Sequence, residues 1–251
     1  MNEIICSDSL IALKKMEDES VDIVLTSPPY NYGMEYDTHD DNGDADEYFE
    51  QIMKVFVECK RVLKSGGRFI INIQPNYKQY SPTHHKITER MIGEGMIWRG
   101  EIIWLKNNLR KLTAWGSWKS PSCPYLSYPF EFIEVFSKDT LKHSGNKEDI
   151  DITKDEFIKY VNGHWSMAPE TKMKEYGHPA MFPEELVERC LKLFSYKGDV
   201  VLDPFNGAGT TTYIANKFGR KYIGIDMSEF YCETARRRIL EFAPLDKFLK
   251  D

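Results

Sequence analysis

Residues 199–212 carry the sequence DVVLDPFNGAGTTT, and this stretch decides the fold. Its apolar beginning predicts a buried strand, and the Gly-x-Gly turn and the threonines after it predict the start of a helix. A strand that runs through such a turn into a helix brings backbone N–H groups to a ligand at the carboxyl edge of a sheet. The stretch therefore predicts an α/β fold with a ligand site at that edge.

A second strand that ends in an acid follows the glycine turn. Residues 222–226 are predicted to form this strand, and its last residue, Asp226, can accept hydrogen bonds from both hydroxyls of a ribose. The turn at 207–209 lacks the third glycine of the dinucleotide pattern and the Lys-Ser/Thr of a phosphate loop. A nucleoside with a small charged tail is therefore a better ligand than a pyrophosphate, and Asp203 is placed to meet a cationic amino group.

A loop that carries hydroxyl, carbonyl and aromatic groups follows another apolar run. Residues 21–25 (VDIVL) predict a buried strand, and TSPPYN at 26–31 comes directly after it. Two successive prolines fix two φ angles and remove two backbone donors, so the chain leaves the sheet as a stiff loop. The hydroxyl and carbonyl groups of this loop could accept hydrogen bonds from an amino group, and its aromatic ring could stack on a planar ring. The alternative is an ordinary proline turn after a strand.

The composition bounds the class of protein. The chain has 251 residues, of which 41% are hydrophobic and 29% charged, as in a globular protein with one large α/β domain. No apolar run is as long as a membrane span, and no signal-like segment follows Met1. The five cysteines form no CxxC pair. This pattern favours reduced thiols in a cytoplasmic protein and argues against a zinc site.

The other elements follow from periodicity and turn residues. Apolar faces at helical spacing predict helices at 9–14, 48–63, 83–94, 184–194, 210–218 and 229–240. Apolar runs predict further strands at 4–8, 68–73, 100–106 and 131–137. The glycines in KSGG at 64–67 are predicted to stop the second helix. The last two strands are predicted to form an antiparallel hairpin, because no helix is predicted between them.

Charge is uneven along the chain, although the net charge is only −6. No Asp or Glu occurs from 102 to 130, where basic and aromatic residues are interleaved: Lys106, Arg110, Lys111 and Lys119 with Trp104, Trp115, Trp118, Tyr125 and Tyr128. This mixture suits contact with phosphates and unstacked bases, whereas the alternative is a loop that packs its tryptophans on the domain.

Residues 33–47 are acidic and form either a solvated loop or a flap beside 26–31. Residues 138–165 are polar and are predicted to be an insertion.

Taken together, the motifs resemble those of amino-group DNA methyltransferases of the β class, which use S-adenosylmethionine (AdoMet). TSPPYN at 26–31 resembles the catalytic loop of that family, and HPAMFP at 178–183 the short motif ahead of the cofactor half. DPFNGAGTT at 203–211 resembles its glycine loop, and GIDMSEFYCETARRRI at 224–239 its ribose-binding segment. The matches keep the order of the family and extend over nearly the whole chain.

The resemblance implies a fold and a division of the chain. The fold is the Rossmann-like AdoMet methyltransferase fold: a mostly parallel sheet of seven strands with one antiparallel hairpin strand, circularly permuted so that the catalytic half precedes the cofactor half. Residues 1–106, 131–137 and 177–251 would form the catalytic, AdoMet-binding domain. Residues 107–130 and 138–176 would be target-recognition insertions.

The resemblance also implies roles for individual residues. The catalytic residues would be Ser27, Pro28, Pro29 and Tyr30. The AdoMet-binding residues would be Asp8, Thr26, Phe182, Pro183, Asp203, Pro204, Phe205, Asn206, Gly207, Gly209, Thr210, Thr211 and Asp226. The residues that contact DNA would be Lys106, Arg110, Lys111, Trp115, Trp118 and Lys119. No metal is expected.

The implied reaction is methylation of an exocyclic amino group of a base in double-stranded DNA. Such a base must be flipped out of the duplex, and Ser27 with the Pro28 carbonyl would hold its amino group while Tyr30 stacks on it. Methylation at carbon 5 would need a Pro-Cys nucleophile, but Cys123 follows a serine.

The choice of base is less well determined than the reaction. Serine at the head of the loop favours N4 of cytosine by resemblance, and N6 of adenine is the alternative. A more distant alternative is an RNA or protein amide methyltransferase. The resemblance implies a prokaryotic or phage-type cytosol, and leaves a cognate restriction endonuclease and a homodimer open as partners.

Overall fold

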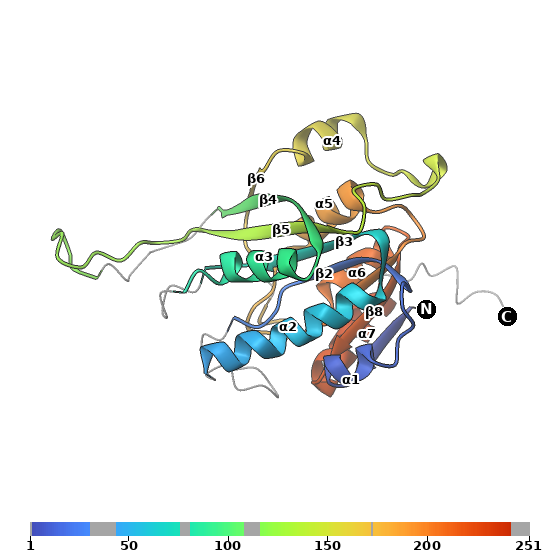
Figure 1. The fold of residues 1–251 in the computed structure, drawn as a ribbon, viewed down its shortest axis with the longest axis horizontal. Helices are drawn as coiled ribbons and strands as arrows, with labels where there is room; N and C mark the ends of the chain where they lie inside the picture. Colours follow the sequence, from blue (N-terminus) through green and yellow to red (C-terminus); the bar gives the residue numbers. More distant parts are fainter. Residues whose placement is uncertain (1, 31–43, 76–80, 108–115, 172, 242–251) are drawn as a thin grey trace.

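We describe the chain from a computed structural model, which defines residues 2–30, 44–75, 81–107, 116–171 and 173–241. Within these residues eight strands form one sheet, and helices cover both of its faces (Figure 1). In chain order the elements are β1 (Glu3–Cys6), α1 (Ser9–Leu13), β2 (Val21–Thr26), α2 (Ala45–Val62), β3 (Leu63–Ile73), α3 (Thr83–Gly93), β4 (Met96–Lys106), β5 (Phe130–Lys138), η1 (Lys147–Asp149), α4 (Lys154–Tyr160), β6 (His164–Met167), α5 (Glu184–Phe194), β7 (Val200–Asp203), α6 (Thr210–Lys217), β8 (Lys221–Asp226) and α7 (Glu229–Glu241).

The strand order in the sheet is β1-β8-β7-β2-β3-β5-β4-β6. Neighbouring strands are parallel except at β5, which runs antiparallel to both β3 and β4. The predicted hairpin is therefore confirmed, and Ile102 pairs with Ile133 in it. The predicted fold class is confirmed too, but with eight strands in place of seven.

The additional strand is β6, which lies in the segment predicted to be an insertion and pairs in parallel with β4. Its four residues alternate between exposed and buried, with Trp165 and Met167 facing the core. So short an alternation is hard to recognise in a polar segment. The predicted insertion at 138–176 thus contributes an edge strand to the main sheet.

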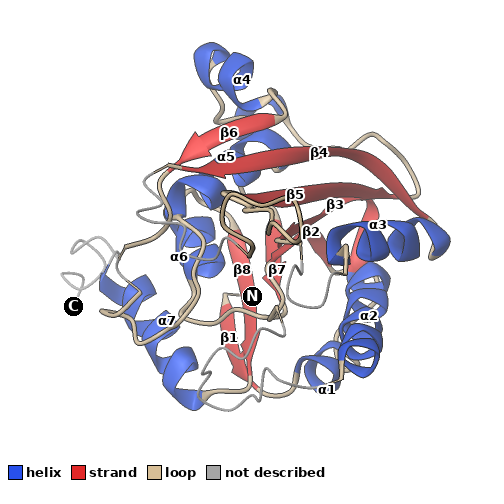
Figure 2. Cartoon of the chain, turned by 90° about the vertical axis from the view of Figure 1, so that its left-hand side faces the viewer, coloured by secondary structure: helices blue, strands red, loops and turns tan. Residues whose placement is uncertain are grey.

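Strands β7 and β2 are neighbours at the middle of the sheet, and the chain leaves them toward opposite faces. Helix α6 follows β7 onto one face, and α2 covers the other (Figure 2). Loops that diverge in this way leave a crevice at the carboxyl edge of a sheet. The fold therefore positions a ligand site between the loop after β2 and the loop after β7.

Two apolar cores sandwich the sheet. The first lies under α1, α2 and α3 and contains Phe56 and Phe69, whose rings meet edge to face at 5.1 Å. The second lies under α4, α5, α6 and α7 and contains Trp104 and Trp165. Both faces of the sheet are thus covered by helices, as its central parallel strands require.

Helix α2 passes directly into β3, so the predicted glycine stop at 64–67 is wrong. Leu63 already has extended backbone angles, and the glycines lie inside the strand. A Cβ on Gly67 would lie 2.8 Å from the carbonyl oxygen of Asp22, and the register between β2 and β3 shifts at this place. Gly67 therefore permits a close approach of β3 to β2.

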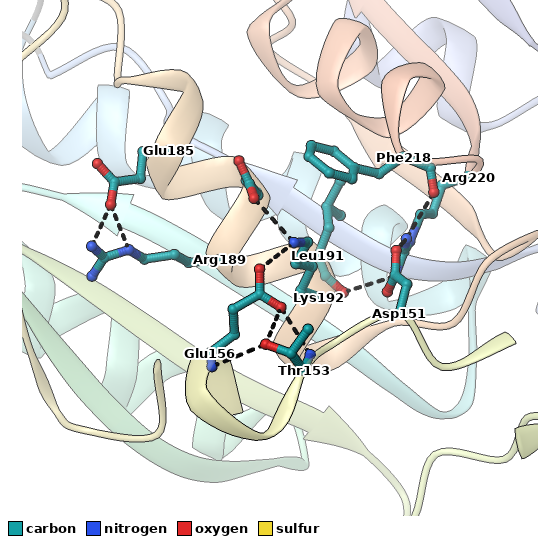
Figure 3. Close-up of polar contacts among 10 residues, drawn as sticks. Asp151, Thr153, Glu156, Glu185, Arg189, Leu191, Lys192, Phe218 and Arg220 are labelled. Carbon is teal, nitrogen blue, oxygen red and sulfur yellow. Dashed lines mark hydrogen bonds and ion pairs between the residues drawn. The ribbon is translucent and has the colours of Figure 1, made fainter. Parts of the chain in front are cut away.

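The segment between β5 and β6 is fastened to the body by ion pairs (Figure 3). Asp151 pairs with the buried Arg220, which also donates to the carbonyl of Ser195 at 2.9 Å. Glu156, in the capping box that begins α4, pairs with Lys192 of α5. Because breaking a buried pair typically costs about 3–5 kcal/mol, the segment is a fixed part of the fold.

Within the described residues, no helix is both long enough and apolar enough to cross a membrane.

Candidate active site

A pocket of about 460 Å³ lies at the carboxyl edge of the sheet. Its walls include the loops after four parallel strands, with Asp8 after β1, Ser27 after β2, Pro204 after β7 and Met227 after β8. The glycine turn and the proline loop therefore face the same cavity, at the crevice that the strand order creates.

Two glycines in left-handed conformations shape the turn after β7. Gly207 has a φ of 48°, and Gly209, at the start of α6, has a φ of 80°. A Cβ on Gly209 would lie 2.5 Å from the Cβ of Ala235, so the packing of the turn on α7 also requires glycine. The turn consequently presents its backbone to the pocket.

Asn206 fixes the turn against β8. Its N–H donates to the carbonyl of Ile225 at 2.9 Å, and the Thr212 hydroxyl donates to its side-chain oxygen at 3.0 Å. A Cβ on Gly224 would lie 2.5 Å from Asn206 Cγ, so the strand glycine makes room for this side chain. Asn206 lines the pocket, and its Nδ2 is buried without a hydrogen-bond partner among the described residues. A ligand oxygen could accept from that nitrogen.

The acid at the end of β8 is held by backbone groups. Asp226 accepts from the Gly207 N–H at 2.8 Å through one carboxylate oxygen and from the Ser228 N–H at 2.9 Å through the other. A carboxylate oxygen has more than one acceptor direction, so vicinal hydroxyls in the pocket could also donate to Asp226. Asp8 lines the pocket beyond β1 and accepts from the Ile11 N–H at 2.9 Å.

Asp203 is the buried acid at the base of the pocket. Its Oδ1 accepts from the Thr26 hydroxyl at 2.7 Å and from the Phe205 N–H at 3.0 Å. Burial raises the pKa of Asp203 to about 6, although these hydrogen bonds favour the carboxylate. A cationic ligand group beside it would stabilise the ionised form. Thr26 joins the two central strands through this contact.

The segment before α5 covers the glycine turn. A Cβ on Gly207 would lie 2.6 Å from His178 Nε2, so the imidazole rests directly on the turn. Burial lowers the pKa of His178 to about 4, and its ring lies 4.6 Å from that of Tyr231. The ring is therefore neutral at physiological pH. Phe182, in the same segment, also lines the pocket.

On the opposite wall, the proline loop is linked to β5. The Ser27 hydroxyl lies 2.9 Å from the Tyr30 hydroxyl, which donates to Glu131 Oε2 at 3.1 Å. Asn72 Nδ2 donates to the Tyr30 hydroxyl at 3.0 Å and also to Glu131. Lys106 forms an ion pair with the other carboxylate oxygen of Glu131. All five side chains line the pocket, so a polar network forms this wall.

Comparison with known proteins identifies the family. The model of the N6_N4_Mtase family, described as DNA methylase, matches residues 21–237. The chain belongs to this DNA methylase family. It is 32% identical to the type II methyltransferase M.HpaI of Haemophilus parainfluenzae, over 94% of this chain and 73% of that protein. It is 30% identical to the DNA adenine methyltransferase YhdJ of Escherichia coli, over 94% of this chain and 82% of that protein.

A solved structure with a similar fold supports the assignment to this family. TTHA0409 of Thermus thermophilus, in complex with S-adenosyl-L-methionine, superimposes with a TM-score of 0.78 at 26% identity, covering 97% of this chain and 95% of that one. The chain is thus an AdoMet-dependent DNA amino-methyltransferase, of a family that acts on N4 of cytosine or N6 of adenine.

The pocket of the methyltransferase fits AdoMet. The buried carboxyl of Asp203 suits a cationic amino group, the unpartnered Asn206 Nδ2 suits a carboxylate oxygen, and Asp226 suits ribose hydroxyls. Among the described residues, no three His, Cys, Asp or Glu side chains gather into a group that could hold a metal ion.

Most residues predicted to bind AdoMet or to act in catalysis meet in the pocket of the methyltransferase. The residues that line it are Asp8, Ser27, Pro28, Pro29, Tyr30, Phe182, Asp203, Pro204, Phe205, Asn206, Gly207, Thr210 and Asp226. Four others support it from outside the lining. Thr26 binds Asp203, Pro183 and Gly209 cap α5 and α6, and Thr211 is buried in α6.

The described residues among those predicted to contact DNA lie in two places. Lys106 lines the pocket, whereas Trp118 and Lys119 belong to the described residues 116–129 between β4 and β5, which project from the body in Figure 1 and are called the arm. Trp118 is 65% exposed, and the Lys119 ammonium lies 5.7 Å from the centre of its ring. Most of the Trp118 side chain is therefore exposed to solvent. Arg110, Lys111 and Trp115 lie outside the described residues, as does most of the acidic segment at 33–47.

Sequence reasoning missed the polar residues that support the proline loop. Glu131 and Asn72 are buried in strands β5 and β3, and neither was predicted to belong to the site. A signal was present, because each is a polar residue in an apolar strand, and buried polar residues need partners. The pattern could not identify the partner of Glu131, since Tyr30 is remote in sequence.

Proposed function

We propose that this methyltransferase transfers the methyl group of AdoMet to N4 of a flipped cytosine at a specific site in double-stranded DNA. The observation that carries the proposal is the hydroxyl of Ser27, which lines the pocket on the wall opposite the glycine turn. An amino group that donates to this hydroxyl would lie between the two walls, where a methyl donor on the glycine turn can reach it.

The proline loop would position the amino group. Hydrogen bonds from the amino group to Ser27 Oγ and to the Pro28 carbonyl favour a pyramidal nitrogen whose lone pair points at the methyl carbon. Pro29 keeps the loop stiff, because its ring fixes the backbone. The ring of Tyr30 would stack on the flipped base. AdoMet supplies an electrophilic methyl group on a sulfonium, so no covalent intermediate with the protein is needed.

The cofactor would lie along the glycine turn. Asp203 would meet its amino group, with Thr26 holding that carboxylate, and Asp226 would accept from the ribose hydroxyls. Asp8, two positions beyond the partner of Asp226 in β1, would receive the adenine amino group. Phe182 would cover the cofactor from the segment before α5. The residues that support the turn itself are Pro183, Pro204, Phe205, Asn206, Gly207, Gly209, Thr210 and Thr211.

The preference for cytosine is supported by Lys106. Along the Watson–Crick edge, cytosine carries two acceptors beside its amino group, N3 and O2, whereas adenine carries the acceptor N1 and the C2–H group. The Lys106 ammonium has three donors, one of which meets Glu131 in the pocket. A remaining donor could meet O2 of cytosine, and adenine has no equivalent acceptor. Ser27 at the head of the loop also favours cytosine by resemblance.

N6 of adenine is the second candidate. It is favoured by the similarity to YhdJ, a DNA adenine methyltransferase that is 30% identical to this chain. The two amino groups offer the same pair of donors to Ser27 and Pro28, so the loop alone does not distinguish them.

The DNA would be held by the arm between β4 and β5. Lys106, Trp118 and Lys119, with Arg110, Lys111 and Trp115 of the same segment, supply cations for phosphates and rings for unstacked bases. We propose that residues 107–130 recognise the target site and that the segment 138–176 assists them.

The similarity to a type II methyltransferase supports a role in restriction–modification, with a cognate endonuclease as partner. We propose that the enzyme acts in a prokaryotic or phage-type cytoplasm, and a homodimer is a further candidate assembly.

Product analysis tests the base. The purified enzyme is incubated with AdoMet and a random double-stranded DNA library, and the DNA is digested to nucleosides for mass spectrometry. We expect N4-methylcytosine at defined sites, and about a hundredfold less or lower still in the same time with a Ser27→Ala control. N6-methyladenine would establish the second candidate. Methylation of RNA or of a protein amide, with none on DNA, would contradict both.

A further inference from the structure

The donors and acceptors around Tyr30 fix the direction of each hydrogen bond. The Glu131 carboxylate, ion-paired to Lys106, can only accept, so the Tyr30 hydroxyl at 3.1 Å must donate to it. A tyrosine hydroxyl has one proton, so the contact of 2.9 Å between Tyr30 and Ser27 requires Ser27 to donate. The Asn72 amide also donates to Tyr30. Ser27 therefore has its own proton directed to Tyr30, and its lone pairs are available to a substrate.

The three groups form a continuous path for a proton. Each contact between Ser27 Oγ, the Tyr30 hydroxyl and Glu131 Oε2 is 3.1 Å or shorter. The path begins at the hydroxyl that would receive the amino group and ends at a buried carboxylate. We propose that Glu131 is the final acceptor of the proton that the amino group loses, acting through Tyr30 and Ser27.

The proposal rests on the proposed role of Ser27 in amino-group methylation and applies to cytosine and adenine alike. When the nitrogen attacks the methyl carbon, the N–C bond forms, the C–S bond breaks and its electron pair goes to sulfur. The nitrogen is then positively charged and has one proton in excess. That proton passes to Ser27, the Ser27 proton to Tyr30 and the Tyr30 proton to Glu131. The products are a neutral methylamino group and a neutral Glu131 carboxyl.

Lys106 makes this transfer electrostatically balanced. Before the reaction the pocket contains one sulfonium charge and the pair of Glu131 with Lys106. Afterwards the sulfonium charge has gone, Glu131 is neutral and Lys106 keeps its charge, so the net charge is unchanged. No charge needs to enter or leave the pocket during the reaction, and Glu131 releases its proton to water once the product leaves.

Two substitutions separate proton transfer from shape. Tyr30→Phe keeps the ring that stacks on the base but removes the hydroxyl. Glu131→Gln keeps a hydrogen-bond acceptor for Tyr30 but removes the basic carboxylate. The control is Glu134→Gln: this residue is equally buried in β5 but faces the other side of the sheet, where it accepts from Trp98 Nε1 at 2.9 Å.

Single-turnover methylation of a DNA duplex is measured for each variant at pH 7.5 with saturating AdoMet. We expect Tyr30→Phe and Glu131→Gln each to lower the rate about a hundredfold. The double variant should be no slower than either single one, because the two groups act in series. The Glu134→Gln control should match the wild type.

Two readouts other than turnover detect a structural effect. Calorimetry should give the same AdoMet affinity for all variants, and the fluorescence of 2-aminopurine at the target position should report the same base flipping with S-adenosylhomocysteine bound. Rates within threefold of the wild type for Tyr30→Phe and Glu131→Gln would overturn the relay, and so would a loss explained by weaker AdoMet binding or flipping. If the wild type makes no methylamino base, the proposed function itself has failed.

Discussion

The two walls of the pocket are built in different ways. The cofactor wall consists mainly of backbone: the glycine turn at 204–210, together with acids whose carboxylates are held by N–H groups, as Asp226 is by Gly207 and Ser228. The catalytic wall consists of side chains from separate segments, with Tyr30 meeting Glu131 of a strand far along the chain. One wall is encoded locally, and the other exists only when the sheet has formed.

This difference separates binding from chemistry. A backbone wall has its shape fixed by left-handed glycines and tight packing, so it is formed before any ligand arrives. The catalytic wall depends on which way each hydroxyl proton points. Substitutions on the first wall should therefore change AdoMet affinity, and those on the second should change turnover.

The strongest test of this separation is Ser27→Ala. Because the variant loses the acceptor for the amino group, we expect turnover at saturating AdoMet to fall about 10²–10³-fold, as when one positioned hydrogen-bonding group is removed from an active site. The AdoMet affinity measured by calorimetry should stay within twofold of the wild type. The matched control is Ser9→Ala, which removes a hydroxyl that donates to the Pro204 carbonyl at 2.5 Å on the cofactor wall. Its effect should be on affinity, and if Ser27→Ala weakens AdoMet binding as strongly as it slows turnover, the walls are not separate.

Asp226→Ala tests the cofactor wall, and it should change AdoMet affinity while leaving turnover nearly unchanged. Hydrogen bonds to a charged group contribute about 1.5–3 kcal/mol, so losing the ribose contact should weaken AdoMet binding about 10–100-fold. Turnover at saturating AdoMet, and DNA affinity in a filter-binding assay, should change less than threefold. Asp226→Asn keeps one acceptor oxygen and should give an intermediate affinity. An unchanged AdoMet affinity in both variants would remove Asp226 from the cofactor site.

The difference between a locally encoded wall and a wall built from distant segments also explains which parts of the site the sequence could predict. The glycine turn and Asp226 lie in one stretch whose residue types indicate its backbone geometry, so the sequence could predict that the residues of this wall lie together, as they do in the pocket. The proline loop was equally recognisable because two prolines leave the backbone few alternatives. The antiparallel position of β5 followed from the missing helix between two strands.

What could not be predicted depends on pairing between distant segments. Glu131 reaches Tyr30 only because β5 lies beside β3, a neighbour relation that no local pattern encodes. Strand β6 was missed because only Trp165 and Met167 in it face the core. Gly66 and Gly67 were interpreted as a helix stop, although Gly67 lies in β3 and lets it approach β2, where a Cβ would meet the carbonyl oxygen of Asp22.

The pH dependence of AdoMet binding tests whether the negative charge of Asp203 holds the cofactor. Burial raises the pKa of Asp203 to about 6, so the folded enzyme binds a proton at this carboxyl more tightly than the unfolded chain does. Only the ionised carboxylate attracts a cationic amino group. AdoMet affinity should therefore fall about tenfold between pH 7.5 and pH 5, measured by calorimetry. In Asp203→Asn the affinity should be lower at pH 7.5 and flat over this range. Its Oδ1 can still accept from both Thr26 and Phe205.

The same substitution has a consequence for stability. The buried carboxylate disfavours the folded state above its raised pKa, so Asp203→Asn should raise the melting temperature of the free enzyme at pH 7.5. Wild-type affinity that stays constant between pH 7.5 and pH 5 would contradict the role of the Asp203 charge.

The smallest expected effect concerns the arm, which should act on DNA without influencing either wall. Lys119 lies on the exposed part of the arm beside Trp118, and each lysine that neutralises a phosphate adds about 0.9 to the slope of log affinity against log salt. Lys119→Ala should therefore lower the slope by about that amount and weaken DNA binding about threefold more at 50 mM than at 200 mM salt. AdoMet affinity should be unchanged. Lys197→Ala is the control, because Lys197 is exposed just before the amino end of β7, at the edge of the sheet opposite the pocket. An equal change of slope in the two variants would mean that Lys119 contributes only to the net charge of the protein, and the contact with phosphate would have to come from another part of the chain.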